Sequence, residues 1–277
     1  MSKRTRETDG LLDSGQGFLI TDENTSLYSL PSTKMLNEQL KSLKADLANK
    51  KGNVTVLKRL VDTNFFLKKY KEAIAYGKQI LVTEVTNQKV RLKIAHAALR
   101  LRKYHYAEFI LSQLPCDKDT ECSNLQGVIA YNRGKIKEAL EYFKRALTLS
   151  TKNIAASLNL ALLYMEFYKF DDALAEVRSI LKQSPKDKNA KLILAVLFVL
   201  QRKLDKAEDL LDDLYAKNKT NPVVLHNMSA NALKMRDYNK ALKLINRTLK
   251  YAPRYTFSID KSIKLKEEIV LKKKAGG

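Results

Sequence analysis

The sequence predicts an all-α fold, a solenoid made of about six helix-turn-helix units, and three observations lead to it. A short motif ending in an internal alanine recurs six times, at spacings of 34, 32, 34, 34 and 34 residues. The apolar residues of segments such as LNLALLYMEF (158–167) follow the period of a helix rather than that of a strand. Only nine glycines occur, and five of them lie within the first 17 or the last two residues, which argues against many tight β-turns or phosphate-binding loops.

Each unit is predicted to be a pair of amphipathic helices joined by a short turn. The recurring alanines are Ala73, Ala107, Ala139, Ala173, Ala207 and Ala241. A bulky residue precedes each alanine by three positions: Tyr70, Tyr104, Ile136, Phe170, Leu204 and Tyr238. The alanine is small, so the second helix can approach the first closely. Pro185 and Pro253 fall where a second helix must end.

This pattern resembles the tetratricopeptide repeat family. The units span residues 54–87, 88–119, 120–153, 154–187, 188–221 and 222–255. The third is most similar, with small and aromatic residues where the family places them: Gly127, Ala130, Ala139, Phe143 and Ala146. Asn64 and Gly77 depart from the pattern, and the chain has no tryptophan at the family's early position. The resemblance implies a right-handed α-solenoid whose first helices form a concave, peptide-binding or helix-binding surface.

The chain ends are predicted to flank the solenoid. Residues 1–31 are rich in Gly, Ser, Thr and acidic residues and are expected to be a flexible tail. Residues 32–52 are expected to form a helix capped by Ser32 and ending near Lys50. Its apolar side would consist of Met35, Leu36, Leu40, Leu43 and Leu47. Residues 256–277 are predicted to contain a capping helix at 257–274 and a basic tail, since the last unit needs a polar-backed cover.

Composition narrows the functional class. The formal charge is +21, and hydrophobic residues make up 45% of the 277, enough for a core. No window approaches 18 apolar residues, and the first thirty residues lack an apolar signal core. We therefore expect a soluble, cytoplasmic protein without a membrane span.

Catalysis has little support in the residues. His96, His105 and His226 lie in separate units, and no HExxH, CxxC, P-loop or GxSxG motif occurs. Cys116 and Cys122 are interpreted as ordinary residues of a tight junction, with a redox pair or a metal site as the alternative; no further ligand is evident. The prediction is a protein that is not an enzyme and has no cofactor and no metal.

A partner groove is predicted on the first helices, mainly in the fourth to sixth units. Its residues are Leu158, Leu162, Met165, Leu192, Val196, Val199, Leu200, Leu233, His226, Tyr131 and Asn132. So apolar a surface is expected to bind an amphipathic helix or an apolar peptide. Alternatively, tight winding or the C-terminal helix covers it, or the N-terminal tail occupies it through Leu11-Leu12 and Phe18-Leu19-Ile20.

One variant of the family grips a peptide's terminal carboxylate with a Lys and an Asn one turn apart. Here Lys58 is followed one turn later by Asp62, which would repel a carboxylate. We therefore expect no such chaperone-tail binding.

A basic edge is predicted at the turns within the units. Its residues are Lys69, Lys103, Lys135, Lys169, Lys203, Arg102, Arg202 and Arg236. One hypothesis is that these cations offset the dipole at the end of each first helix. The other is that they dock an acidic protein face, because their fields add at a nearby anion.

Together these features predict a non-enzymatic protein-interaction scaffold or adaptor. It would hold an apolar peptide or helix in its groove and present basic surfaces to an acidic partner. The alternative is a nucleic-acid-associated protein that uses its basic ends: residues 34–106 carry +12 and residues 222–277 carry +9. Acidic residues between the bases, and tyrosines at core positions, count against that alternative.

Overall fold

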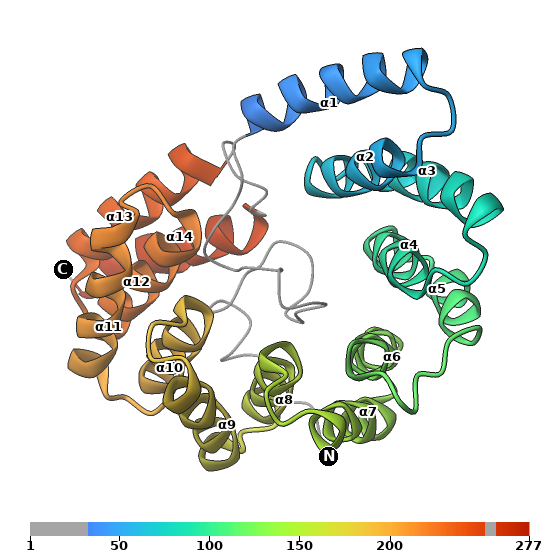
Figure 1. The fold of residues 1–277 in the computed structure, drawn as a ribbon. Coiled ribbons are helices and arrows are strands. Elements are labelled where there is room, and N and C mark those ends of the chain that lie inside the picture. The colour runs from blue at the N-terminus through green and yellow to red at the C-terminus, as the bar shows by residue number, and fades with distance from the viewer. Residues whose placement is uncertain (1–32, 253–258, 277) are drawn as a thin grey trace. The chain divides into compact units, whose positions relative to one another are not determined.

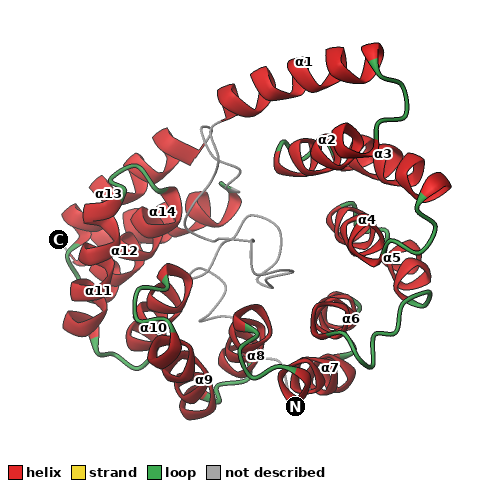
Figure 2. Ribbon diagram, in the orientation of Figure 1, coloured by secondary structure: helices red, strands yellow, loops and turns green. Residues whose placement is uncertain are grey.

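A computed structural model describes residues 33–252 and 259–276 (Figure 1). The predicted N-terminal tail, the predicted cap Ser32 and Pro253 lie outside the described residues. The described part contains helices and no strand, as Figure 2 shows, so the all-α prediction is confirmed.

Fourteen helices are described, and twelve of them form six consecutive hairpins between a first helix α1 and a last helix α14. The helices are α1 (Thr33–Asn49), α2 (Val54–Phe66), α3 (Tyr70–Thr83), α4 (Gln88–Arg100), α5 (Tyr104–Leu111), α6 (Thr120–Asn132), α7 (Ile136–Leu149), α8 (Ile154–Glu166), α9 (Phe170–Gln183), α10 (Lys188–Leu200), α11 (Leu204–Lys217), α12 (Pro222–Lys234), α13 (Tyr238–Tyr251) and α14 (Asp260–Gly276). They divide into two compact units, Pro31–Asn153 and Ile154–Gly277, which are described separately below.

Asparagine and aspartate side chains start the first helices of the hairpins. Asn53 accepts hydrogen bonds from two backbone N–H groups of α2, and Asp187 accepts one from Ala190 at 2.7 Å. The same role falls to Asn87, Asp119 and Asn221. These caps satisfy N–H groups that have no partner inside the helix.

The recurring alanines lie at the contact between the two helices of each hairpin and are at most 1% exposed, as expected. The two helices of α6/α7 approach one another very closely at Gly127. A Cβ atom on Gly127 would lie 2.5 Å from Cε1 of Phe143, a ring that is itself fully buried. Glycine at 127 therefore lets this hairpin close over a large aromatic side chain.

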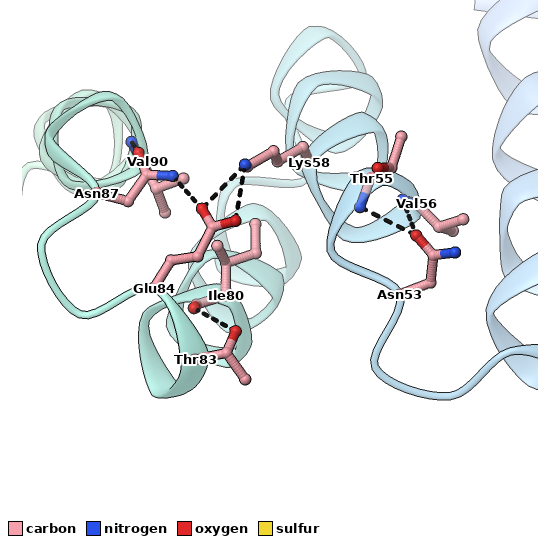
Figure 3. A network of polar contacts seen from close by, with 9 residues as sticks. All are labelled: Asn53, Thr55, Val56, Lys58, Ile80, Thr83, Glu84, Asn87 and Val90. Atoms are coloured by element: carbon pink, nitrogen blue, oxygen red, sulfur yellow. Dashed lines mark hydrogen bonds and ion pairs between the residues drawn. The ribbon is translucent and has the colours of Figure 1, made fainter.

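Within the first unit, Glu84 joins three helices at the junction between two hairpins (Figure 3). Its carboxylate lies 2.9 Å from Nζ of Lys58 on α2 and accepts a hydrogen bond from Asn87, the cap of α4. These bonds, chiefly the one from Lys58, lower the pKa of Glu84. The carboxylate thus fixes the end of α3 to both neighbouring first helices.

The ends of the chain differ in detail from expectation. Leu36, Leu40 and Leu43 of α1 are buried, but Met35 is 58% exposed, so its placement on the apolar side was wrong. Residues four apart share a helix face, and Met35 is one position off the Leu36–Leu40 stripe. In the second unit, Leu265 and Ile269 of α14 are buried, and α14 packs on α12 and α13.

The junction cysteines also differ from expectation. Cys116 and Cys122 are buried and joined in a disulfide, with their Cα atoms 4.9 Å apart. Interpreting them as ordinary residues of a tight junction was therefore wrong, and the disulfide fits the alternative of a redox pair. The turn in CDKDTEC brings the two Cα atoms within disulfide range, which a separation of six positions in the sequence does not reveal.

In the second unit, Asp213 of α11 is held between two lysines, which gives a testable acid dependence. Its carboxylate oxygens lie 2.7 Å from Nζ of Lys191 and 2.8 Å from Nζ of Lys217, and these bonds lower its pKa from 3.8 to about 2. Its stabilising contribution is complete above about pH 4 and is lost as pH falls toward about 2. Asp213→Asn should therefore lower stability at neutral pH and flatten the acid dependence in that window, measured by urea unfolding at a series of pH values.

The adjacent Asp212 provides a matched control with the opposite sign. Desolvation, and next the negative charge of Glu208, raise the pKa of Asp212. Its ionised form is thus disfavoured by folding, so Asp212→Asn should not lower stability at neutral pH. If the stability of the two variants changes equally between about pH 4 and about pH 2, the lowered pKa of Asp213 is not the source of the acid dependence.

Candidate functional site

The turn inside every hairpin has one repeated backbone geometry. In the first hairpin, Lys68 N–H donates to the Phe65 carbonyl at 3.0 Å and Lys69 N–H donates to the Asn64 carbonyl at 2.8 Å. The same pair of bonds closes the other five first helices. This is the helix ending in which one residue takes the left-handed conformation, a position usually filled by glycine.

Only one of the six hairpins has glycine at that left-handed position. It is Gly134, with φ of 75°. The other five have larger residues at φ between 57° and 65°: Lys68, Arg102, Tyr168, Arg202 and Arg236. A side chain costs about 1 kcal/mol or more in this conformation, because Cβ crowds the following carbonyl. Four of the five residues that bear this cost are cationic.

The next residue in each turn is the N-cap of the second helix. Lys69, Lys103, Lys135, Lys169 and Lys203 occupy it, and none makes a side-chain capping bond. In the last hairpin Asp237 does cap, accepting from Lys240 N–H at 2.9 Å. A cation at this position meets the positive end of the second helix's dipole. The same residue also follows the negative end of the first helix, so the hypothesis that these lysines offset the dipole of the first helix stays a prediction.

We call the eight predicted cations Lys69, Lys103, Lys135, Lys169, Lys203, Arg102, Arg202 and Arg236 the basic turn edge. All eight are exposed. Lys135 lies 3.0 Å from Glu138 and Lys169 lies 3.9 Å from Asp172, both exposed pairs that neutralise little. Among the described residues, six of these cations form no ion pair. They are Lys69, Arg102 and Lys103 in the first unit and Arg202, Lys203 and Arg236 in the second. Their charges remain available to a partner.

A further cation strengthens this edge in the first unit. Lys68 is half-buried, and its pKa is lowered first by burial and second by the charge of Arg100. Nε of Arg100 is buried without a hydrogen-bond partner among the described residues. Two like charges are therefore held near one another at the C-terminal ends of α2 and α4.

The predicted groove residues of α8 and α10 form a regular stripe, which we call the apolar face: Leu158, Leu162, Met165, Leu192, Val196 and Val199. Leu158, Leu162 and Met165 of α8 are 1%, 6% and 3% exposed, and the α10 residues are 0–1% exposed. Leu200, at the end of α10, is half-buried. The structure thus brings the apolar face together, but as a covered surface rather than an open one.

The remaining predicted groove residues belong elsewhere. His226 is buried in α12, and its Nδ1 lies 2.9 Å from Oγ of Ser262 on α14, while Leu233 of the same helix is also buried. The chain's own last helix therefore occupies this part of the expected groove. Tyr131 and Asn132 end α6 in the other unit, where the Asn132 side chain donates to the Val128 carbonyl at 2.8 Å.

The residues compared with a carboxylate clamp are engaged within the first unit. Lys58 pairs with Glu84, and Asp62 pairs with Lys93. Among the residues that the structure describes, no cluster of three or more metal-ligating side chains occurs. In the same part of the chain, no helix has both the length and the apolar character needed to cross a membrane.

Comparison with known proteins agrees with this geometry. Residues 130–197 match the family model described as "Tetratricopeptide repeat". This stretch, which runs from the end of α6 into α10, is thus similar to the tetratricopeptide repeat family. Folds of this type are in general protein-interaction scaffolds and are typically non-catalytic. No curated protein sequence matches the chain.

Solved structures show the same tetratricopeptide repeat fold at low identity. A tetratricopeptide repeat protein from Parabacteroides merdae has a TM-score of 0.65 and 15% identity, over 85% of this chain and 92% of that one. For the APC/C hetero-tetramer Cut9–Hcn1 the TM-score is 0.67 and the identity 16%, over 88% of this chain and 48% of that one. For the human IFIT1 dimer with PPP-AAAA the TM-score is 0.68 and the identity 15%, over 87% of this chain and 61% of that one.

The cations of the turns were predictable from the repeat in the sequence, but the left-handed conformation of the larger residues at five of the six turns was not predicted. The available signal was Gly134. It occupies in the third hairpin the place that Lys68, Arg102 and Arg202 occupy in others, and glycine at a repeated turn position indicates a left-handed residue.

Proposed function

We propose that this protein is a non-catalytic scaffold with two binding surfaces. The basic turn edge docks an acidic face of a protein partner. The apolar face of α8 and α10, which is covered in this structure, takes an apolar peptide or one side of a partner helix only after its cover is displaced, in the mode of a helix in a groove.

The conformation of the turn cations carries this proposal. At the left-handed position stability alone would favour glycine, and at the N-cap it would favour Asp, Asn or Ser. Gly134 and Asp237 show that the chain accepts both solutions at equivalent places. The other turns place exposed Lys and Arg there, at a cost in stability. Strained or suboptimal residues that recur at exposed equivalent positions support a role in binding.

Glycine substitutions separate folding from binding in this scaffold. Arg102→Gly, Arg202→Gly and Arg236→Gly should each raise the free energy of unfolding by about 1 kcal/mol, since the left-handed strain is relieved. Together they should weaken binding to poly-L-glutamate on the order of tenfold, measured by fluorescence anisotropy, because three exposed charges are lost. The remaining binding should depend less steeply on salt.

Tyr168→Gly is the matched control, because it relieves the same backbone strain without changing the charge. It should raise stability and leave the affinity for poly-L-glutamate unchanged. Unchanged affinity of the triple variant would overturn the docking role, and lower stability of the triple variant would overturn the strain argument.

A nucleic acid is the second candidate for the basic turn edge. The overall charge of +21 favours it, and the fold similarity to the IFIT1 dimer with PPP-AAAA makes it worth testing. A single-stranded oligonucleotide in the same anisotropy assay, at matched salt, distinguishes the two. Tighter binding of the oligonucleotide than of poly-L-glutamate would support this candidate.

The cytoplasm is the proposed location. The disulfide between Cys116 and Cys122 is of a kind more common in oxidising compartments. In the cytoplasm this bond is expected to be reduced, so thiol labelling in intact cells should modify both cysteines. Cysteines that stay unlabelled until a reductant is added would contradict the cytoplasmic location.

A further inference from the structure

We propose that the C-terminal ends of α2 and α4 in the first unit form a pocket for one phosphate group, carried by a phosphorylated residue of a partner peptide. Its donors are Lys68, Tyr70 and Arg100. The pocket is separate from the basic turn edge and from the apolar face, so it does not depend on the roles proposed for them. Unused hydrogen-bonding groups, convergent positive charge and an exposed ring beside them support it.

Arg100 and Tyr70 have polar groups that no other described residue uses. Nε of Arg100 is buried without a hydrogen-bond partner, and Arg100 forms no ion pair within the described chain. Tyr70 is only 8% exposed, and its hydroxyl makes no hydrogen bond in the part of the chain that the structure describes. Donors left unused in this way cost free energy. A ligand with acceptor oxygens would satisfy both groups.

The ring of Phe65 places these groups at one corner of the first unit. Its centroid lies 5.4 Å from that of Tyr70, the first residue of α3, and 6.1 Å from that of His96, one turn before Arg100 on α4. Burial, and next the charge of Arg100, lower the pKa of Lys68. Burial raises the pKa of Tyr70, and the charge of Arg100 opposes that rise. The guanidinium therefore lies near both of the other donors.

A phosphate monoester matches these donors better than a carboxylate does. It carries about −1.5 to −2 charge at neutral pH and has three strong acceptor oxygens, whereas a carboxylate carries a single charge on two oxygens. The Lys68 ammonium and the Arg100 guanidinium balance the larger charge. With the Tyr70 hydroxyl, they supply one donor group for each oxygen. Hydrogen bonds to an ionised group are roughly twice as strong as those between neutral groups.

The helix dipole offers a different explanation for Arg100 alone. Arg100 lies in the last turn of α4, where a cation interacts favourably with the helix end. Side chains in that role hydrogen-bond the last carbonyl groups, and Nε of Arg100 makes no such bond. Nor does the end of α4 explain why the Tyr70 hydroxyl, at the start of α3, has no partner among the described residues.

Acidic side chains near the pocket favour one phosphate over a chain of phosphates. Asp62 of α2 pairs with Lys93 and is 42% exposed, and Glu121 of α6 lies 3.9 Å from His96 and is 43% exposed. A nucleic-acid strand carries a phosphate on every nucleotide, so the phosphates next to the bound one would approach these carboxylates. A peptide with one phosphorylated residue avoids that repulsion.

An exposed ring favours an apolar residue beside the phosphorylated one. Phe66, the last residue of α2, is 47% exposed, and its ring centroid lies 6.4 Å from that of Phe65. It holds on α2 the place that Arg100 holds on α4, 34 residues later, and these two helices are neighbours (Figure 1). A peptide can thus set an apolar side chain against Phe66 while its phosphate meets Arg100.

Titration calorimetry with two synthetic peptides tests the pocket in the full chain. The probe is an alanine-based peptide with one phosphoserine followed by leucine, and the reference peptide has unmodified serine at that place. The phosphorylated peptide should bind at least about tenfold more tightly, because its hydrogen bonds are charge-assisted. Equal affinities for the two peptides would overturn the proposal.

Two substitutions remove donors one at a time. Tyr70→Phe deletes only a hydroxyl and Arg100→Gln removes one charge, and each should weaken binding of the phosphorylated peptide on the order of tenfold. The matched control, Lys89→Gln, removes an exposed cation from the other end of α4 and should change the affinity less than about twofold. If the control weakens binding as much as Arg100→Gln does, overall charge explains the affinity and the pocket does not exist.

Further probes identify the source of the phosphate. Inorganic phosphate and a short oligoadenylate with a 5′-terminal phosphate should both bind more weakly than the phosphorylated peptide. Tighter binding of either one would contradict the assignment to a peptide. Poly-L-glutamate should bind the Tyr70→Phe variant as tightly as the unmodified chain, because the basic turn edge is untouched. Loss of the pocket is therefore distinguishable from loss of the docking edge.

Discussion

Replacing Phe143 by alanine is expected to lower the free energy of unfolding by about 3–5 kcal/mol, the largest single effect in the first unit. Phe143 of α7 is fully buried, and its ring packs against the backbone of Gly127 in α6. Removing the ring loses its burial and leaves a cavity that two helices at close range cannot collapse to fill. Urea unfolding followed by far-ultraviolet circular dichroism measures the loss.

A double-mutant cycle with Gly127 checks the cause of that loss. Gly127→Ala alone should cost about 1–3 kcal/mol, since its Cβ would lie 2.5 Å from the Phe143 ring. In the Phe143→Ala background the same methyl group occupies the cavity, so the cost should disappear or reverse. Additive losses from the two substitutions would contradict a direct contact between these residues.

Ala173→Leu is expected to destabilise the second unit by about 3 kcal/mol. Ala173 lies in the first turn of α9, fully buried where α9 crosses α8. A leucine there forces the two helices apart or their neighbours out of preferred rotamers, because the packing around it is already dense. The unfolding midpoint in urea should fall while the helical signal of the folded protein stays.

Ala175 offers a control two residues along the same helix. It is exposed, so Ala175→Leu should change stability by no more than about 0.5 kcal/mol. Both substitutions have the same effect on helix propensity, and only one adds volume at the crossing. Equal losses at the two positions would show that the effect does not arise from the α8–α9 contact.

The turn substitutions and the core substitutions should move stability in opposite directions. The alanines and Gly127 are already the residues that packing favours, so a change there costs stability. The turn residues Arg102, Arg202 and Arg236 are not what their backbone favours, so glycine should improve stability and reduce binding. A protein that gives up stability at exposed positions but not in its core is expected to use those positions for recognition.

The repeat and its helices were determined by the sequence alone. The alanine spacing and the helical apolar period are local properties of the chain, and they set hairpin positions such as α6/α7 and α8/α9 within a few residues. Asn53, Asp187 and Asn221 start helices through bonds to backbone groups two or three residues away, so neighbouring sequence suffices to place them. The end of α9 before Pro185 follows from the same kind of short-range restriction.

Only the tertiary structure decided which faces are covered and what the turn cations cost. Leu162 and Val196 have the same chemistry in a covered face as in an open groove, and burial depends on segments distant in the chain. The engagement of His226 with Ser262 joins residues 36 positions apart, beyond the reach of any local pattern. Arg102 and Arg202 take a left-handed conformation because the second helix must fold back on the first, a requirement of hairpin packing that overrides the preference of the residue itself.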